Sequence, residues 1–284
     1  MNDLIAKRVW FITGCSRGLG RALALATLDR GHRVVATARA AESLAGLVDR
    51  YPDHCRTLAL DVTRPEEVAT VVAEAAAAFG RLDVVVNNAG YGLIGALEEV
   101  TEEQIRRNFE TNFFGAVHVM RAALPILRTQ RQGHFVTISA AAAIGNYPGF
   151  SIYGATKWAL EGVSESLAAE VRPLGLKVTL VQPGPFRTDF IAHSLERAET
   201  PLADYADTRG KFQRLLESMD GRQPGDPAKA AAAIIAAVES ERPPLRLVLG
   251  KYAIDKARRS RTPAGRELDA WAELGSATEF PPVS

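Results

Sequence analysis

The sequence predicts an α/β protein built on one doubly wound parallel sheet with helices on both faces. Short runs rich in β-branched residues alternate with stretches rich in alanine and leucine along most of the chain. The strand-like runs are apolar without polar alternation, which is typical of strands covered on both faces. This alternation of strands and helices therefore favours one parallel sheet.

Seven segments carry the strand pattern, and helical segments such as residues 19–30 and 65–79 lie between them. The expected strands are residues 9–12, 33–37, 57–60, 83–86, 135–138, 178–181 and 245–249. We find no internal repeat and no low-complexity linker. The sequence thus predicts a single domain over residues 1–250, followed by an extension over residues 251–284.

Two regions interrupt the alternation. Residues 185–225 form a long polar stretch with several prolines and glycines, and connections of this length are usually functional lids or disordered loops. We expect a lid there. In the extension, Leu268, Trp271 and Leu274 recur at helical spacing. They predict a helix that packs on the domain or contacts a neighbouring subunit.

Composition and charge restrict the class of partner. The 284 residues carry a net charge of +1, which gives no electrostatic reason to expect a nucleic acid. No apolar run approaches the ~20 residues of a membrane span, and the first eight residues lack the apolar region of a secretion signal. Cys15 and Cys55 have no ligand-like spacing, so no metal site is expected. We expect a cytoplasmic protein.

A glycine-rich turn follows the first expected strand. Glycines let the backbone approach a pyrophosphate, whose charge the N-terminus of the next helix stabilises. The spacing G-x3-G-x-G departs from the G-x-G-x-x-G fingerprint, and a plain strand-to-helix turn is the alternative. The position directly after a strand favours a dinucleotide site. Its expected residues are Gly14, Ser16, Arg17, Gly18, Leu19 and Gly20.

The end of the second expected strand indicates which cofactor is preferred. A site for NAD places an acidic residue about 20 positions after the turn, where it holds the ribose 2′-hydroxyl. Here Arg39 occupies that place, and Arg17 lies in the turn. Arginine binds phosphate oxygens in pairs, so both residues suit the 2′-phosphate of NADP(H). The alternative is that both are ordinary surface arginines.

Tyr153 and Lys157 are the candidate catalytic pair. Four residues apart, they lie on one face of a helix, about one turn from each other. A phenol ordinarily loses its proton only near pH ~10, and a nearby ammonium lowers that pKa. The pair is therefore expected to transfer protons. The alternative is a surface tyrosine beside a solvated lysine.

With these residues together, the chain resembles the short-chain dehydrogenase/reductase family, whose fold is Rossmann-like. The motifs occur in the family's order from Val9 to Thr188, and members that act on ketones, including hydroxysteroid-dehydrogenase-like ones, are the most similar. The matching pieces are the glycine turn, Asp61-Val62, Asn87-Asn88-Ala89-Gly90, Asn112, Tyr153 with Lys157, and the stretch from Pro183 to Thr188.

The resemblance implies roles for these residues. Lys157 would lower the pKa of Tyr153 and bind the nicotinamide ribose, and Asn112 would hold a water that links Lys157 to solvent. Alternatively, Asp61 would only cap the helix at residues 65–79, and Asn112 would only stabilise a helix kink. The implied cofactor contacts are Asp61 and Val62 at the adenine, Asn87, Ala89 and Gly90 along the adenosine and nicotinamide-side ribose, and Pro183, Gly184, Phe186 and Thr188 at the nicotinamide.

The chain departs from the family at one position. Members carry a serine thirteen residues before the tyrosine, where it hydrogen-bonds the reacting carbonyl, and that position is Ala140 here. One extra loop residue would restore Ser139 to the site, but no clear insertion is evident. Otherwise the alanine is natural or was introduced to trap a ligand. Loss of one such donor lowers the rate ~10²–10³-fold, so activity is expected to be reduced.

The sequence as a whole predicts an NADP(H)-dependent oxidoreductase that interconverts a ketone or aldehyde and an alcohol, with Tyr153 as proton donor and acceptor. Ala140, Tyr147 and Phe186 are expected to contact the substrate. The expected partner is a small carbonyl compound, with a homodimer or homotetramer as the assembly. A sensor or scaffold that binds the cofactor without turnover is one alternative, and an epimerase or dehydratase is another.

Overall fold

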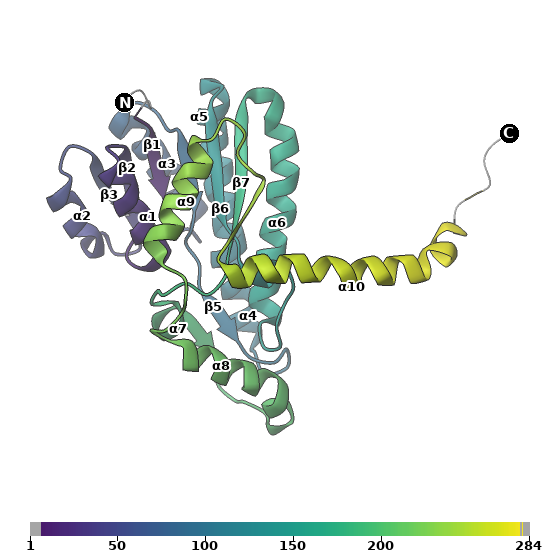
Figure 1. The fold of residues 1–284 in the computed structure, drawn as a ribbon. Coiled ribbons are helices and arrows are strands. Elements are labelled where there is room, and N and C mark those ends of the chain that lie inside the picture. Colours follow the sequence, from purple (N-terminus) through teal and green to yellow (C-terminus); the bar gives the residue numbers. More distant parts are fainter. Residues whose placement is uncertain (1–6, 279, 281–284) are drawn as a thin grey trace.

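The computed structural model describes residues 7–278 and 280, and its centre is a seven-stranded parallel sheet (Figure 1). The strands lie in the order β3-β2-β1-β4-β6-β7-β9. Each of the seven expected strand segments overlaps one of them, so the predicted sheet is confirmed. The strands are β1 (Val9–Ile12), β2 (Arg33–Ala38), β3 (Cys55–Ala59), β4 (Val84–Asn87), β6 (Gly133–Ile138), β7 (Leu176–Pro183) and β9 (Arg246–Leu249).

Helices cover both faces of this sheet, because successive strand residues point to opposite sides. Trp10 and Ile12 pack in one apolar layer with α1 (Gly18–Asp29), α2 (Ala45–Arg50) and α9 (Pro227–Glu239). Val9 and Phe11 pack in the other layer. Its helices are α3 (Pro65–Phe79), α5 (Gly115–Gln130) and α6 (Ser151–Val171).

The strand order reverses between β1 and β4, which are hydrogen-bonded neighbours. In a doubly wound sheet, connections from two neighbouring strands leave in opposite directions at such a point, and a crevice opens beyond their carboxyl ends. The glycine-rich turn follows β1 and the loop from Asn88 follows β4. The topology therefore brings these two predicted motifs to the same edge of the sheet.

The expected lid is a closed excursion from this edge. Its first and last residues meet, because the Arg187 backbone N–H donates to Gly225 O at 2.8 Å and the Gly225 N–H donates to Pro185 O at 3.1 Å. The excursion contains α7 (Phe190–His193), β8 (Leu195–Arg197) and α8 (Lys211–Met219). Strand β8 pairs with β5 (Gly92–Ile94), a two-stranded sheet that we did not predict.

A buried ion pair fastens the lid to the body just before α4 (Glu102–Phe109). The Arg209 guanidinium donates to both carboxylate oxygens of Glu99, at 2.8 Å and 2.5 Å. The side chains of Glu99 and Arg209 are 0% and 10% exposed. The same carboxylate accepts the backbone N–H groups of Ala96 and Leu202. The lid is thus held by a fully hydrogen-bonded charge pair.

The C-terminal helix α10 (Lys251–Ser276) begins against the body and then projects away from it (Figure 1). Ala253 in its first turn is buried, whereas Leu268, Trp271 and Leu274 are 70%, 67% and 64% exposed. The outer turns of the extension therefore do not pack on the described part of the domain, and their contact with a neighbouring subunit stays a prediction. Within residues 7–278 and 280, the stripe contacts no apolar surface, because the helix leaves the body before reaching it (Figure 1). Among the described residues, no helix is both long and apolar enough to cross a membrane.

Candidate active site

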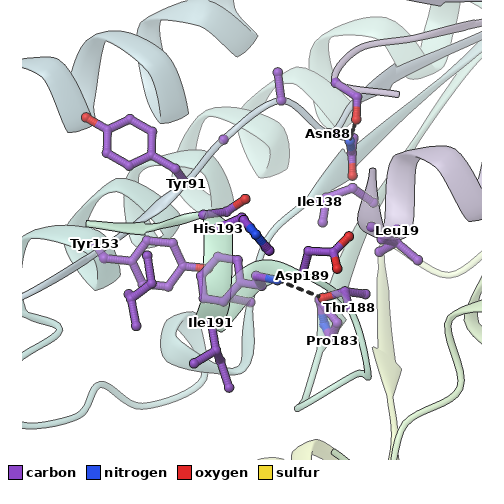
Figure 2. A pocket seen from close by; sticks show the side chains of 18 of the residues that line it. Leu19, Asn88, Tyr91, Ile138, Tyr153, Pro183, Thr188, Asp189, Ile191 and His193 are labelled. Carbon is purple, nitrogen blue, oxygen red and sulfur yellow. Dashed lines mark hydrogen bonds between the residues drawn. The ribbon is translucent and has the colours of Figure 1, made fainter. Parts of the chain in front are cut away.

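A cavity of about 1430 Å³ runs along the carboxyl edge of the sheet, from the glycine turn to the lid (Figure 2). It brings together most of the residues that the sequence singled out. Asn87 and Asn112 are the predicted site residues that do not line it. The residues that do are Gly14, Ser16, Arg17, Gly18, Leu19, Gly20, Arg39, Asp61, Val62, Ala89, Gly90, Ser139, Ala140, Tyr147, Tyr153, Lys157, Pro183, Gly184, Phe186 and Thr188.

The glycine turn has the form of an anion cradle. Gly14 and Gly18 adopt φ values of +71° and +60°, which side chains rarely tolerate. A Cβ on Gly20 would collide with the Asn88 side chain. Arg17 precedes helix α1 without capping its N–H groups, and the first turn holds no acidic residue. These amides and the helix dipole suit a pyrophosphate.

Asn88 supports this turn from the neighbouring strand, a role that sequence reasoning missed. Its Nδ2 donates to the carbonyl oxygens of Thr13 and Gly14, at 2.8 Å and 3.0 Å. Asn87, which we expected at the adenosine, instead buries both polar atoms of its amide, without a partner among the described residues. Successive residues at a strand end point to opposite sides, so Asn87 and Asn88 face different surroundings. In the sequence, the only sign of this role was the pair of adjacent asparagines.

The far end of the cavity carries the residues expected at the adenosine. Arg17 and Arg39 both line it, both are exposed, and neither forms an ion pair with a described residue. Asp61 Oδ1 accepts the backbone N–H and hydroxyl of Thr63, at 3.0 Å and 2.7 Å. Helix α3 begins after Arg64 with no side-chain cap. The alternative that Asp61 caps this helix is therefore wrong.

Tyr153 and Lys157 are buried together in the wall of the cavity. They lie one turn apart on α6, and their exposed fractions are 7% and 6%. Lys157 Nζ donates to the carbonyl of Ile138 at 3.0 Å and lies 5.8 Å from the centroid of the Tyr153 ring. The alternative of a solvated surface pair is therefore wrong.

Burial dominates the electrostatics of this pair. It raises the pKa of Tyr153 above its ordinary value and lowers the pKa of Lys157 to about 8. We expected the ammonium of Lys157 to lower the pKa of Tyr153. In the protein without a bound cofactor the pKa is raised instead, because desolvation of the phenolate outweighs any attraction to Lys157. Tyr153 consequently holds its proton near neutral pH.

Asn112 stands behind the cavity rather than in its wall. It lies in a π-helical turn, Glu110–Phe114, and such turns are frequent at functional sites. Its amide donates to Tyr91 O at 2.9 Å and accepts the Tyr91 N–H at 2.9 Å. A Cβ on Gly90 would lie only 2.8 Å from Asn112 Oδ1. Asn112 thus ties the loop after β4 to the kinked helix.

The structure places Ala140, and not Ser139, beside the tyrosine. Ala140 packs in one apolar cluster with Phe150 and Tyr153. Ser139 contributes to the cavity wall, but its hydroxyl is buried and has no hydrogen-bond partner among the described residues. The expected catalytic role of Ser139 is therefore not supported, because its hydroxyl is buried and does not face the open cavity.

An aromatic chamber adjoins Tyr153 beneath the lid. The Phe150 ring lies 4.9 Å from that of Tyr153 and 5.0 Å from that of Phe212, and the Phe190 ring lies 5.9 Å from that of Tyr153. Tyr147 stacks on Phe212. The lid adds aliphatic side chains to this wall, from Ile191, Leu195, Leu215, Leu216 and Met219. This part of the cavity therefore suits an apolar molecule.

Comparisons with known proteins find dehydrogenases, reductases and other oxidoreductases. A family model for short chain dehydrogenases matches residues 8–199. The oxidoreductase BOA17 of Botryotinia fuckeliana is 38% identical, with 95% of this chain and 99% of that protein covered. A 3-ketodihydrosphingosine reductase of Bacteroides thetaiotaomicron is 37% identical, with 86% and 88% covered.

Solved structures are similar over nearly the whole chain. A short-chain dehydrogenase from Streptomyces avermitilis superposes with a TM-score of 0.91 at 43% identity, and 97% of this chain and 100% of that one are covered. A structure of ElxO with NADP bound gives a TM-score of 0.73 at 26% identity, with 88% and 99% covered. The similarity therefore includes the cavity as well as the sheet.

Proposed function

This chain belongs to the short-chain dehydrogenase/reductase family, and from that premise we propose that it is an NADP(H)-dependent oxidoreductase that interconverts a ketone or aldehyde and an alcohol. One observation carries the proposal. Tyr153 and Lys157 are buried side by side in the wall of a single cavity that joins the glycine turn to an apolar chamber. One of the similar proteins is named as a reductase of a 3-keto compound.

The residues of the cavity fit a nicotinamide dinucleotide. The turn from Gly14 to Gly20 and the N-terminus of α1 hold the pyrophosphate. Arg17 and Arg39 pair with a 2′-phosphate, which favours NADP(H) over NAD(H). When bound, the reduced cofactor supplies the hydride for the carbonyl carbon. Thr188 and Gly184, which line the same cavity, would flank the nicotinamide end.

Tyr153 gives its proton to the carbonyl oxygen during reduction and takes it back during oxidation. Its raised pKa keeps the proton available at neutral pH. Lys157 holds the ribose end and, through its hydrogen bond to Ile138 O, stays at a fixed place beside the phenol. The lid covers the chamber and excludes water from the reacting carbonyl.

Because Ala140 has no hydroxyl, Tyr153 is the hydrogen-bond donor left for the carbonyl oxygen of the substrate. Ala140→Ser, which restores the second donor, is therefore the decisive variant. A restored hydroxyl should raise turnover ~10²–10³-fold. NADPH absorbance is followed with aromatic, aliphatic and steroid ketones for both chains. The matched control is Ala141→Ser, which adds a hydroxyl to the next residue of the same wall. Equal rates in all three chains would contradict the proposed role of this position.

The cofactor preference has its own test. Arg39→Ala should weaken NADPH binding at least ~10-fold and leave NADH binding nearly unchanged, because the lost charge-assisted hydrogen bonds reach only the 2′-phosphate. Arg172→Ala, an exposed arginine away from the cavity, is the control. Equal loss of both cofactors in Arg39→Ala would refute the assignment.

Ala140 also favours a second candidate, a cofactor-binding sensor or scaffold with weak or no turnover. Tight NADPH binding without reaction, in the parent chain and in Ala140→Ser alike, would support it. Net NADPH consumption separates the proposed oxidoreductase from the sensor, and also from an epimerase or dehydratase, which regenerates its cofactor. The oligomeric state and the cytoplasmic location stay predictions.

A further inference from the structure

A pair of hydroxyl groups stands in the wall of the aromatic chamber. Tyr147 and Tyr252 both line the cavity, and the Tyr252 hydroxyl donates to the Tyr147 hydroxyl oxygen at 3.0 Å. Two hydroxyls carry two protons, and their mutual bond uses one. Neither side chain has another hydrogen-bond partner among the described residues. Whichever hydroxyl donates, the pair keeps one O–H group available to a ligand.

Two separate segments, the lid and α10, fix the position of Tyr147. The Lys256 Nζ lies 3.3 Å from its ring centroid, and the Phe212 ring stacks on it at 4.8 Å with an interplanar angle of 6°. The Lys256 ammonium and the Phe212 ring lie on opposite faces of the Tyr147 ring, because at these distances they would collide if they shared one face. Phe212 comes from the lid, whereas Tyr252 and Lys256 come from the first two turns of α10. The C-terminal helix therefore contributes to the chamber.

The pair lies within reach of the molecule that Tyr153 contacts. Tyr147 and Tyr153 both touch Phe150, with ring centroids at 6.3 Å and 4.9 Å from it. These separations together limit the distance between the two tyrosine rings to 11.2 Å. A compound with two fused rings and a polar group at each end is therefore a suitable probe of both. Burial and the Tyr252 hydrogen bond raise the pKa of Tyr147, which keeps it a donor.

We propose that the Tyr147–Tyr252 hydroxyl pair binds a second polar group, a hydroxyl or a carbonyl, on an otherwise apolar carbonyl substrate, and that Lys256 is the positioning residue for Tyr147. This inference rests on the proposed function and specifies its substrate class. Discrimination follows because a site built around hydroxyls loses hydrogen bonds when the ligand lacks the matching group. The remaining walls accept the apolar body of the substrate.

The test compares 2-tetralone with its 6-hydroxy and 7-hydroxy derivatives, using the full chain with NADPH. The parent chain should favour one hydroxylated ketone by about 5–10-fold in KM, the worth of one good hydrogen bond. Tyr147→Phe and Tyr252→Phe should each bring that preference, measured as the ratio of KM values within one variant, below about 2-fold. Tyr205→Phe, a lid tyrosine that does not line the cavity, should keep it.

Lys256 is tested by rescue. Lys256→Met should lower the hydroxyl preference, measured as the same ratio of KM values, and Lys256→Arg should restore it, because a guanidinium also stacks on an aromatic ring. Equal affinity for the three ketones in the parent chain, or a preference that both phenylalanine variants retain, would overturn the proposal.

Calorimetric titration of the three ketones into the NADP-loaded chain measures the same preference without turnover. If no ketone is reduced, even by Ala140→Ser, the proposed function fails, but the calorimetric comparison still decides whether the hydroxyl pair binds.

Discussion

The buried pair between Glu99 and Arg209 gives the sharpest prediction about the lid. Each carboxylate oxygen of Glu99 accepts one backbone N–H and one guanidinium N–H. Glu99→Gln replaces one oxygen by an NH2 group, so two buried donors lose their acceptor. At ~1–3 kcal/mol for each unmet donor, and with the ion pair lost, we expect the lid to be destabilised by about 3–5 kcal/mol.

The assay measures the lid and the whole fold separately. Limited proteolysis reports local opening of residues 198–205, and urea unfolding reports global stability. The variants are Glu99→Gln, Arg209→Met and the two combined. The double variant should lose less than the sum of the single losses by at least ~2 kcal/mol, because removal of both partners leaves no lone buried charge.

The control is the exposed pair of Glu102 and Arg106, whose side chains are 69% and 75% exposed. Glu102→Gln should cost less than ~1 kcal/mol. If Glu99→Gln costs no more than this control and does not speed cleavage of the lid, then burial of the pair does not decide its strength, and the reasoning is refuted.

Two further predictions concern pH. Lys157 has a folded pKa of about 8 against 10.5 unfolded, so its destabilising effect is full below pH 8 and disappears as the pH rises to 10.5. Lys157→Met should remove this rise in Tm between pH 7 and 9.5, and an unchanged slope would count against burial as the cause. Burial lowers the pKa of His134 to about 3 from 6.5, so its contribution to stability is present above pH 6.5 and lost as the pH falls toward 3. His134→Gln should make the urea midpoint less sensitive to acid between pH 7 and 5, and equal acid sensitivity of both chains would refute this.

The features that the sequence predicted are local in origin. The seven strands follow from apolar runs bounded by turns, and the glycine turn from its place after the first of them. Tyr153 and Lys157 share a face because helical spacing alone puts them there. These patterns need no knowledge of distant segments, which is why the sheet and most of the cavity wall could be predicted from them.

Other features depend on which segments meet. The paired strands β5 and β8 are three residues each, too short to show a pattern, and they form because the lid returns to the body. Asn87 and Asn88 are adjacent in the chain, yet the strand end turns only Asn88 toward the glycine turn. Ser139 and Ala140 are likewise adjacent, yet only Ala140 packs with Tyr153, whereas the Ser139 hydroxyl is buried.

The sequence by itself determined the doubly wound sheet, the dinucleotide turn and the tyrosine–lysine pair, since strand pattern, glycine conformation and helical spacing act over a few residues. Tertiary structure alone decided the pKa values of that pair, because burial raises the pKa of Tyr153 and lowers that of Lys157. It also decided that Tyr252 of α10 meets Tyr147 in the wall of the cavity. Desolvation and contacts between distant segments arise only when the chain has folded.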